Sequence, residues 1–128
     1  MSDNKIDRYA VFGNPIAHSK SPQIHSLFAE QTDQNLIYTA ELAEVENFDQ
    51  RIAEFINDNG KGMNITVPFK QQAWEICTTR SERAQRAGAV NTIIVQANGE
   101  YFGENTDGLG LVRDLTKNHQ VELKGKRI

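Results

Sequence analysis

A strand, a polar loop and the start of a helix follow one another in RYAVFGNPIAHSKSPQI, residues 8–24. Residues 8–13 are apolar and end in glycine, which is typical of a short buried strand. Ser21 and Pro22 predict the helix start, with the serine as N-cap and the proline at the first helical position. The expected apolar face of this helix has i, i+3, i+4 spacing and consists of Ile24, Leu27 and Phe28.

The same alternation continues along the chain. Further strands are predicted at 36–42, 62–67 and 89–95, and further helices at 48–56, 68–77 and 81–86. Gly60 is expected to cap the helix that precedes it. The Asn98-Gly99 pair indicates a tight turn, so that residues 100–102 pair back as a hairpin. These elements predict an α/β fold, a three-layer αβα domain with a mostly parallel sheet and an antiparallel edge hairpin.

Composition narrows the class of protein. The 128 residues suit one domain, and 17 acidic against 14 basic residues argue against nucleic acid or an anionic membrane as the partner. The single cysteine, Cys77, cannot form an internal disulfide, and no apolar run approaches the length of a membrane span, so we expect a cytoplasmic protein. No spacing of histidine and cysteine suggests a metal site, and no glycine-rich phosphate loop suggests a cofactor site in this chain.

Ser19 and Ser21 lie beside the predicted start of the first helix. Free backbone N–H groups and the positive end of the helix dipole favour an anion there, and two hydroxyls suit a carboxylate or a phosphate. The alternative is that Ser21 only caps the helix.

Asn64 and Thr66 are two residues apart on a predicted strand, so both side chains point to the same side of the sheet. Lys70 follows in the first turn of the helix predicted from residue 68. An amide, a hydroxyl and an ammonium could converge on the hydroxyl groups of a sugar-like ligand. The alternative is that Lys70 is a solvated surface charge.

Asn91 interrupts an otherwise apolar run and needs a hydrogen-bond partner, either the backbone or a ligand. Asp107 lies in the loop 103–108, before a helix that carries Leu109, Leu111, Val112 and Leu115. Asp107 either serves ordinary loop and cap chemistry or pairs with Lys70 to orient it for proton transfer. Because ligands bind at the carboxyl edge of α/β sheets, the four polar clusters together predict one site for a small hydroxylated anion.

Four segments, residues 12–22, 62–70, 88–93 and 105–110, resemble the shikimate dehydrogenase family in this order. The resemblance implies that residues 1–120 are a shikimate-binding catalytic N-terminal domain. Residues 121–128 would be a linker and the start of an absent NADP-binding Rossmann domain. The implied reaction is the NADPH-dependent reduction of 3-dehydroshikimate to shikimate, on the route to chorismate and the aromatic amino acids.

The resemblance also implies residue roles. Ser19 and Ser21 would hold the substrate carboxylate. The groups implied to contact the ring hydroxyls are Asn64, Thr66, Asn91 and Asp107. Lys70 and Asp107 would be the catalytic pair, with Lys70 giving a proton to the carbonyl oxygen and Asp107 orienting it.

Two alternatives stay open. One is a quinate/shikimate dehydrogenase of broader specificity, and the other is a non-catalytic shikimate-binding module. Because the NADP site would lie in the absent half, we expect this chain alone to be inactive. We also expect an exposed apolar patch around Leu111, Val112 and Leu115 and a tendency to self-associate.

Overall fold

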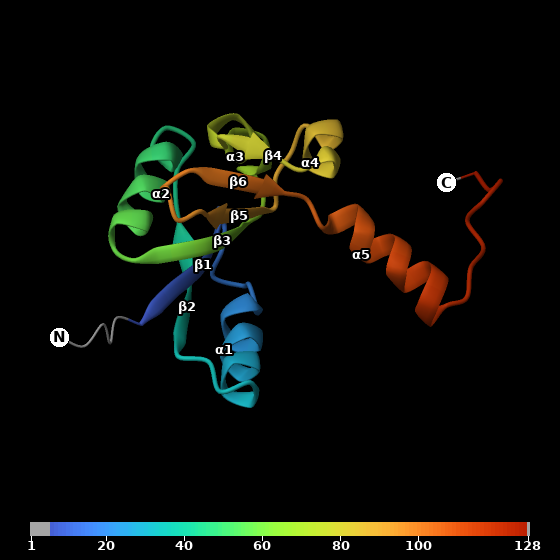
Figure 1. Cartoon of the computed structure of the whole chain (residues 1–128), viewed down its shortest axis with the longest axis horizontal. Helices are drawn as coiled ribbons and strands as arrows, with labels where there is room; N and C mark the ends of the chain where they lie inside the picture. The colour runs from blue at the N-terminus through green and yellow to red at the C-terminus, as the bar shows by residue number, and fades with distance from the viewer. Residues whose placement is uncertain (1–5, 128) are drawn as a thin grey trace.

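The computed structural model describes residues 6–127. A six-stranded sheet in the order β2-β1-β3-β5-β6-β4 forms its centre (Figure 1). The strands are β1 Asp7–Gly13, β2 Leu36–Leu42, β3 Gly60–Ile65, β4 Thr79–Arg80, β5 Thr92–Val95 and β6 Tyr101–Glu104. β1 is parallel to β2 and β3, whereas the β5–β6 hairpin is antiparallel to β3, and the short β4 runs parallel to β6 outside it. The α/β class is thereby confirmed.

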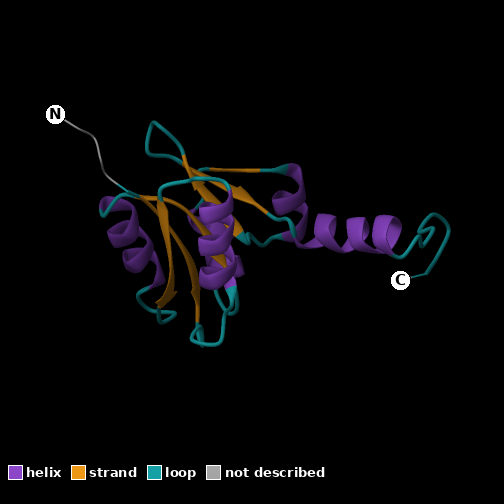
Figure 2. Ribbon diagram, turned by 90° about the horizontal axis from the view of Figure 1, so that it is seen from below, coloured by secondary structure: helices purple, strands orange, loops and turns teal. Residues whose placement is uncertain are grey.

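Helices cover both faces of the sheet (Figure 1). They are α1 Ser21–Gln31, α2 Phe48–Asn57, α3 Lys70–Ile76, α4 Glu82–Ala87 and α5 Asp107–Arg113, the last continued by a π-helical segment, Asp114–Asn118. α2, α3 and α4 lie on one face, and α1 lies on the other. Figure 2 shows that α5 extends away from the sheet.

The main core lies under α2, α3 and α4. Its rings are tightly arranged, with Phe48 stacked on Phe69 at 4.6 Å between centroids and Phe12 edge-on to Phe55 at 5.5 Å. A smaller cluster on the α1 face consists of Val11, Ile16 and Tyr38. Burial of each large apolar side chain contributes about 1.5–3 kcal/mol, so the core that anchors β1 and β3 is on the α2–α4 face.

The expected apolar face of α1 does not pack against the sheet. Ile24, Leu27 and Phe28 are 44%, 56% and 56% exposed, and Ala29 is the buried residue of the helix. α1 contacts the sheet partly through His25, whose ring stacks on Tyr38 at 4.2 Å between centroids. The helix therefore packs through a small residue and a polar aromatic, which the spacing of apolar residues did not reveal.

Two expected helix caps are wrong. Lys20 is the N-cap of α1 and Ser21 is its first helical residue, while the Ser19 hydroxyl accepts a hydrogen bond from the Ser21 N–H at 3.3 Å. Gly60 is the first residue of β3, and the C-cap of α2 is Asp58. A Cβ at position 60 would lie 2.5 Å from the Phe55 ring, so glycine is needed there for close packing.

Other boundaries move by a few residues. α3 begins at Lys70 rather than at Pro68, because residues 67–68 form a turn closed by the Phe69 N–H on the Thr66 carbonyl at 3.0 Å. β5 begins at Thr92 rather than at residue 89, and the two-residue β4 is too short to leave a sequence pattern.

The helical segment 107–118 carries Leu109, Leu111, Val112 and Leu115, as the sequence predicts. Leu111 and Val112 are 58% and 46% exposed, which confirms the expected apolar patch at these two positions, while Leu115 is half-buried. Residues 119–127, most of which the sequence analysis assigns to a linker and the start of a further domain, contain no strand, and Ile128 lies outside the described residues. Within residues 6–127, no helix has the length and apolar character of a membrane span.

Candidate functional site

A cavity of about 240 Å³ opens at the carboxyl ends of β1 and β3. All seven residues that the sequence singled out line it: Ser19, Ser21, Asn64, Thr66, Lys70, Asn91 and Asp107. His18 also lines it, together with the apolar side chains of Val11, Ile16 and Ile65. The structure therefore brings together residues from four separate segments of the chain.

The sheet topology explains this convergence. β1 and β3 are parallel neighbours, with Val11 opposite Asn64, so their carboxyl ends meet at one edge. β5 is antiparallel to β3 and places Thr92 opposite Asn64, and β6 returns to place Glu104 opposite Thr92. The start of β5 and the end of β6 therefore reach the same edge as the two parallel strands.

Close approach at this edge depends on Gly13, the last residue of β1. A Cβ there would lie 2.5 Å from Cγ2 of Thr66 and 2.9 Å from Cδ1 of Ile16. Real Cβ contacts are longer than this, so a side chain at position 13 would push Thr66 out of place.

Lys70 and Asp107 form an ion pair, with 2.7 Å between Nζ and Oδ2. Their side chains are 33% and 56% exposed, and a pair this exposed contributes little to folding stability. Asn105 holds the carboxylate end, because its Oδ1 accepts the Asp107 N–H at 3.0 Å and its Nδ2 donates to the Ala89 carbonyl at 3.1 Å. Hydrogen bonds made by Asn105 thus hold the loop that carries Asp107, and the fold does not depend on the ion pair for its stability.

Asn91 finds its partners in the neighbouring loop. Its Oδ1 accepts the Thr106 N–H at 3.1 Å and the Thr92 hydroxyl at 3.0 Å. Its Nδ2 donates to Oγ1 of Thr106 at 2.9 Å and to Oδ1 of Asp107 at 3.0 Å. Asn91 thus holds the second oxygen of the carboxylate that Lys70 contacts.

The two serines and Asn64 line the same cavity as this pair. Ser19 and Ser21 stand at the amino end of α1, where the helix dipole favours an anion. The Asn64 amide accepts the Tyr38 hydroxyl at 2.6 Å through Oδ1 and donates to Oγ1 of Thr92 at 3.3 Å through Nδ2. The cavity thus combines an anion-favouring end, an amide and an ammonium–carboxylate pair.

Sequence reasoning missed Tyr38 as a site residue. Its side chain is buried on β2 and its hydroxyl reaches Asn64. Burial raises the pKa of Tyr38 to about 12, and the nearby Ser21 hydroxyl opposes this to a smaller extent, so Tyr38 keeps its proton. A tyrosine within a strand needs a partner for its hydroxyl, but the alternation of residues does not say which.

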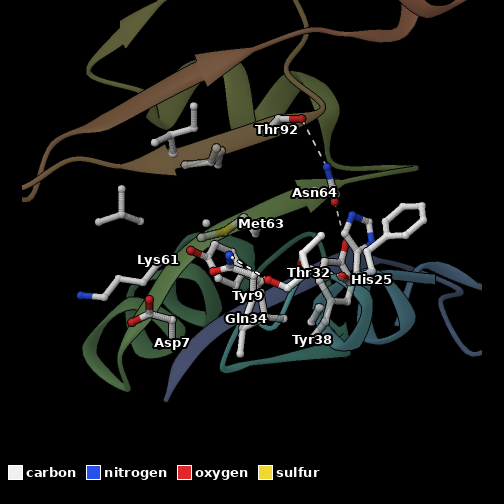
Figure 3. Close-up of a pocket in the computed structure, with 17 residues that line it drawn as sticks. Asp7, Tyr9, His25, Thr32, Gln34, Tyr38, Lys61, Met63, Asn64 and Thr92 are labelled. Atoms are coloured by element: carbon white, nitrogen blue, oxygen red, sulfur yellow. Dashed lines mark hydrogen bonds between the residues drawn. The ribbon is translucent and has the colours of Figure 1, made fainter. Parts of the chain in front are cut away.

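A larger groove of about 610 Å³ adjoins the site on the α1 face of the sheet (Figure 3). Its lining includes Tyr9, Tyr38, Met63 and Thr92, and Asn64 lines both this groove and the smaller, polar cavity. Its walls are mostly apolar side chains, and it lacks the Lys70–Asp107 pair. The smaller cavity is therefore the better candidate for chemistry.

The comparisons with known proteins agree with this geometry. A family described as "Shikimate dehydrogenase substrate binding domain" matches residues 11–93. A relative from Vibrio campbellii named shikimate dehydrogenase (NADP(+)) is 58% identical over 124 residues, which cover 97% of this chain and 44% of the relative. The chain thus spans less than half the length of this relative.

Solved structures of similar proteins also include a shikimate dehydrogenase. An Ael1 enzyme from Pseudomonas putida superposes with a TM-score of 0.88 at 46% identity, covering 94% of this chain and 44% of that one. A shikimate dehydrogenase from Thermus thermophilus in complex with shikimate superposes with a TM-score of 0.85 at 37% identity, covering 94% of this chain and 46% of that one. The chain belongs to the shikimate dehydrogenase substrate-binding domain family.

Proposed function

We infer that this chain is the substrate-binding half of an NADP-dependent shikimate dehydrogenase, which reduces 3-dehydroshikimate to shikimate. Residues 1–120 would bind the substrate, and residues 121–128 would lead toward the cofactor-binding half. The observation that carries this proposal is the single cavity shared by the seven predicted residues, with the Lys70–Asp107 pair at its side. The relatives' name and the Thermus thermophilus complex support the choice of ligand.

Each part of the cavity has a chemical task in this proposal. The Ser19 and Ser21 hydroxyls and the amino end of α1 hold the substrate carboxylate. Asn64, Thr66 and Asn91 contact the ring hydroxyls. Lys70 donates a proton from Nζ to the carbonyl oxygen during reduction and takes it back from the hydroxyl during oxidation, while Asp107 holds the ammonium in place.

NADPH would supply the hydride, and this sequence contains no G-x-G-x-x-G or Walker loop to hold a dinucleotide phosphate. The proposal therefore assigns substrate binding and proton transfer to this chain. With NADPH and 3-dehydroshikimate, the chain alone is expected to give no turnover above background. Measurable oxidation of NADPH would contradict this.

Titration of shikimate into the 15N-labelled chain, followed by NMR, tests the binding proposal. We expect saturable shifts at Ser19, Ser21, Asn64, Lys70 and Asp107. Hydrogen bonds to a charged group are worth about 1.5–3 kcal/mol, so Ser19→Ala or Ser21→Ala should weaken binding about tenfold or more.

Ser26→Ala is the matched control, because Ser26 is an exposed serine of α1 that does not line the cavity. Equal losses in all three serine variants, or no saturable shift in the unmodified chain, would contradict the proposal. Quinate, titrated in parallel, measures whether the same cavity accepts a second hydroxylated carboxylate.

A further inference from the structure

Four side chains form one hydrogen-bonded series that ends on the carboxylate of Asp107. The Tyr38 hydroxyl donates to Asn64 Oδ1 at 2.6 Å, and Asn64 Nδ2 donates to Thr92 Oγ1 at 3.3 Å. The Thr92 hydroxyl then donates to Asn91 Oδ1 at 3.0 Å, and Asn91 Nδ2 donates to Asp107 Oδ1 at 3.0 Å. We call this set, Tyr38, Asn64, Thr92 and Asn91, the polar series.

The donor and acceptor of every hydrogen bond in the polar series follow from the Asp107 carboxylate at its end. The Asp107 carboxylate can only accept, so Asn91 must present Nδ2 to it and turn Oδ1 toward Thr92. Thr92 then donates to Asn91, which leaves its oxygen to accept from Asn64 Nδ2. Oδ1 of Asn64 consequently faces Tyr38, which must donate, and the buried Tyr38 hydroxyl keeps its proton to do so.

A second contact fixes the same orientation. The Thr106 N–H donates to Oδ1 of Asn91 at 3.1 Å, and a backbone N–H cannot act as an acceptor. Both N–H groups of Asn91 are used, on Asp107 and on Thr106. Asn64 keeps one amide N–H beyond its bond to Thr92, so at this point the cavity offers a donor to a ligand hydroxyl.

We propose that Tyr38 and Thr92 are positioning residues that fix the amide orientations of Asn64 and Asn91 and hold Asp107 against Lys70. This inference rests on the proposed function, since the ring hydroxyls of a shikimate-like acid are what the oriented Asn64 amide and the Lys70–Asp107 pair held by Asn91 would recognise. Neither Tyr38 nor Thr92 need touch the substrate. Loss of either hydroxyl frees the Asn64 amide to rotate, and loss of the Thr92 hydroxyl also removes one of the contacts that orient Asn91. This weakens recognition of hydroxyl groups but leaves recognition of the carboxylate intact.

Tyr38→Phe and Thr92→Val test this with little change in packing. The phenyl ring keeps its place beside His25, whose ring stacks on Tyr38 at 4.2 Å, and valine has the shape of threonine. Tyr9→Phe is the matched control, because Tyr9 pairs with Tyr38 in register and lines the same groove outside the polar series. Thr39→Val is the second control, because its hydroxyl donates to Glu41 instead.

Two measurements are made on each variant of the 128-residue chain. The first is the position of the Asn64 and Asn91 side-chain amide signals in the 15N NMR spectrum without ligand. The second is the ratio of the Kd for shikimate to the Kd for cyclohex-1-ene-1-carboxylate, which has the carboxylate but no ring hydroxyls. We expect both variants to move the Asn64 amide signal, and Thr92→Val to move the Asn91 signal as well. Both variants should weaken shikimate binding about three- to tenfold and leave binding of the second ligand unchanged.

Unmoved amide signals, or equal weakening of both ligands, would overturn the proposal, since a purely structural role would affect both ligands alike. The same changes in the Tyr9→Phe and Thr39→Val controls would overturn it as well. If the unmodified chain binds no shikimate, the proposed function fails. The amide signals measured without ligand then still show whether Tyr38 and Thr92 orient the two amides.

Discussion

At the scale of single residues, the Lys70–Asp107 pair is expected to matter for catalytic activity and little for folding stability. Because both side chains are partly exposed, Lys70→Met should change the free energy of unfolding by less than about 1 kcal/mol. The same change removes the proton donor, so activity should fall at least a hundredfold when the chain is joined to the remaining residues of the Vibrio campbellii relative. Urea unfolding and steady-state kinetics measure the two effects.

Lys61→Met serves as the control, because Lys61 is exposed on β3 outside the polar cavity. A large loss of stability in Lys70→Met would show that the pair is structural. Activity retained by Lys70→Met would remove Lys70 from the proposed proton transfer.

Glu104 is a second residue whose surroundings shift its pKa and thereby make folding stability depend on pH. Burial would raise the pKa of Glu104, but hydrogen bonds from Ser81, from the Asn105 N–H and from Arg83, with the Arg83 charge, lower it overall. A carboxyl group with a lowered folded-state pKa stabilises the fold above its unfolded-state pKa, and this stability is lost as the pH falls through the folded-state value. We therefore expect stability to decline as the pH falls below about 4.5, the ordinary value.

Glu104→Gln should flatten this acid decline in thermal unfolding measured between neutral and acid pH. Glu100→Gln is the control, because Glu100 is exposed in the hairpin turn. An identical acid decline in Glu104→Gln and the unmodified chain would contradict the expected contribution.

Local patterns predicted the site residues because each is a polar residue at or near the end of a strand or the start of a helix. Their convergence followed from the rule that strand ends in α/β sheets meet at one edge. Tyr38 and Thr92 were not predicted, because their roles depend on hydrogen bonds to Asn64, which lies 26 residues after Tyr38 and 28 residues before Thr92. Such long-range pairings appear only when the register of the strands is known.

At the scale of elements, Gly60 shows how a helix end and a strand start constrain each other. A Cβ at position 60 would lie 2.5 Å from the Phe55 ring and 2.6 Å from the Phe55 carbonyl oxygen. Gly60→Ala should therefore destabilise the fold by about 1–3 kcal/mol, because the core under α2 must shift. Gly110→Ala is the control, since a Cβ there meets nothing within 4 Å and alanine favours the helix.

Urea unfolding measures both glycine variants. Gly110→Ala should be neutral or slightly stabilising. Equal stability of Gly60→Ala and the unmodified chain would contradict this prediction, because it would mean that Phe55 can move away from position 60 at no cost in free energy.

Element type was easier to predict than element orientation. The alternation of strands and helices was correct, and the hairpin at Asn98-Gly99 formed as expected. The face of α1 was wrong, because apolar spacing assumes that the most apolar stripe is buried. The helix instead uses Ala29 and the stacked His25, whose fit depends on Tyr38 of the neighbouring strand.

At the scale of the whole molecule, apolar side chains remain exposed on two helices. α1 exposes Ile24, Leu27 and Phe28, and α5, which extends away from the sheet, exposes Leu111 and Val112 (Figure 2). Contiguous exposed apolar surface promotes association between molecules. We therefore expect the average mass of the chain in solution, measured by light scattering, to rise with protein concentration.

Leu111→Lys separates α5 from α1 as the source of this association. The change replaces a side chain that is 58% exposed, so it should leave the fold intact while reducing the rise in mass. Thr116→Lys is the charge-matched control, because it adds the same charge in the exposed segment that follows α5 without removing an apolar side chain. A constant monomer mass in the unmodified chain would contradict self-association, and equal effects of the two lysine variants would assign any change to net charge rather than to the apolar surface of α5.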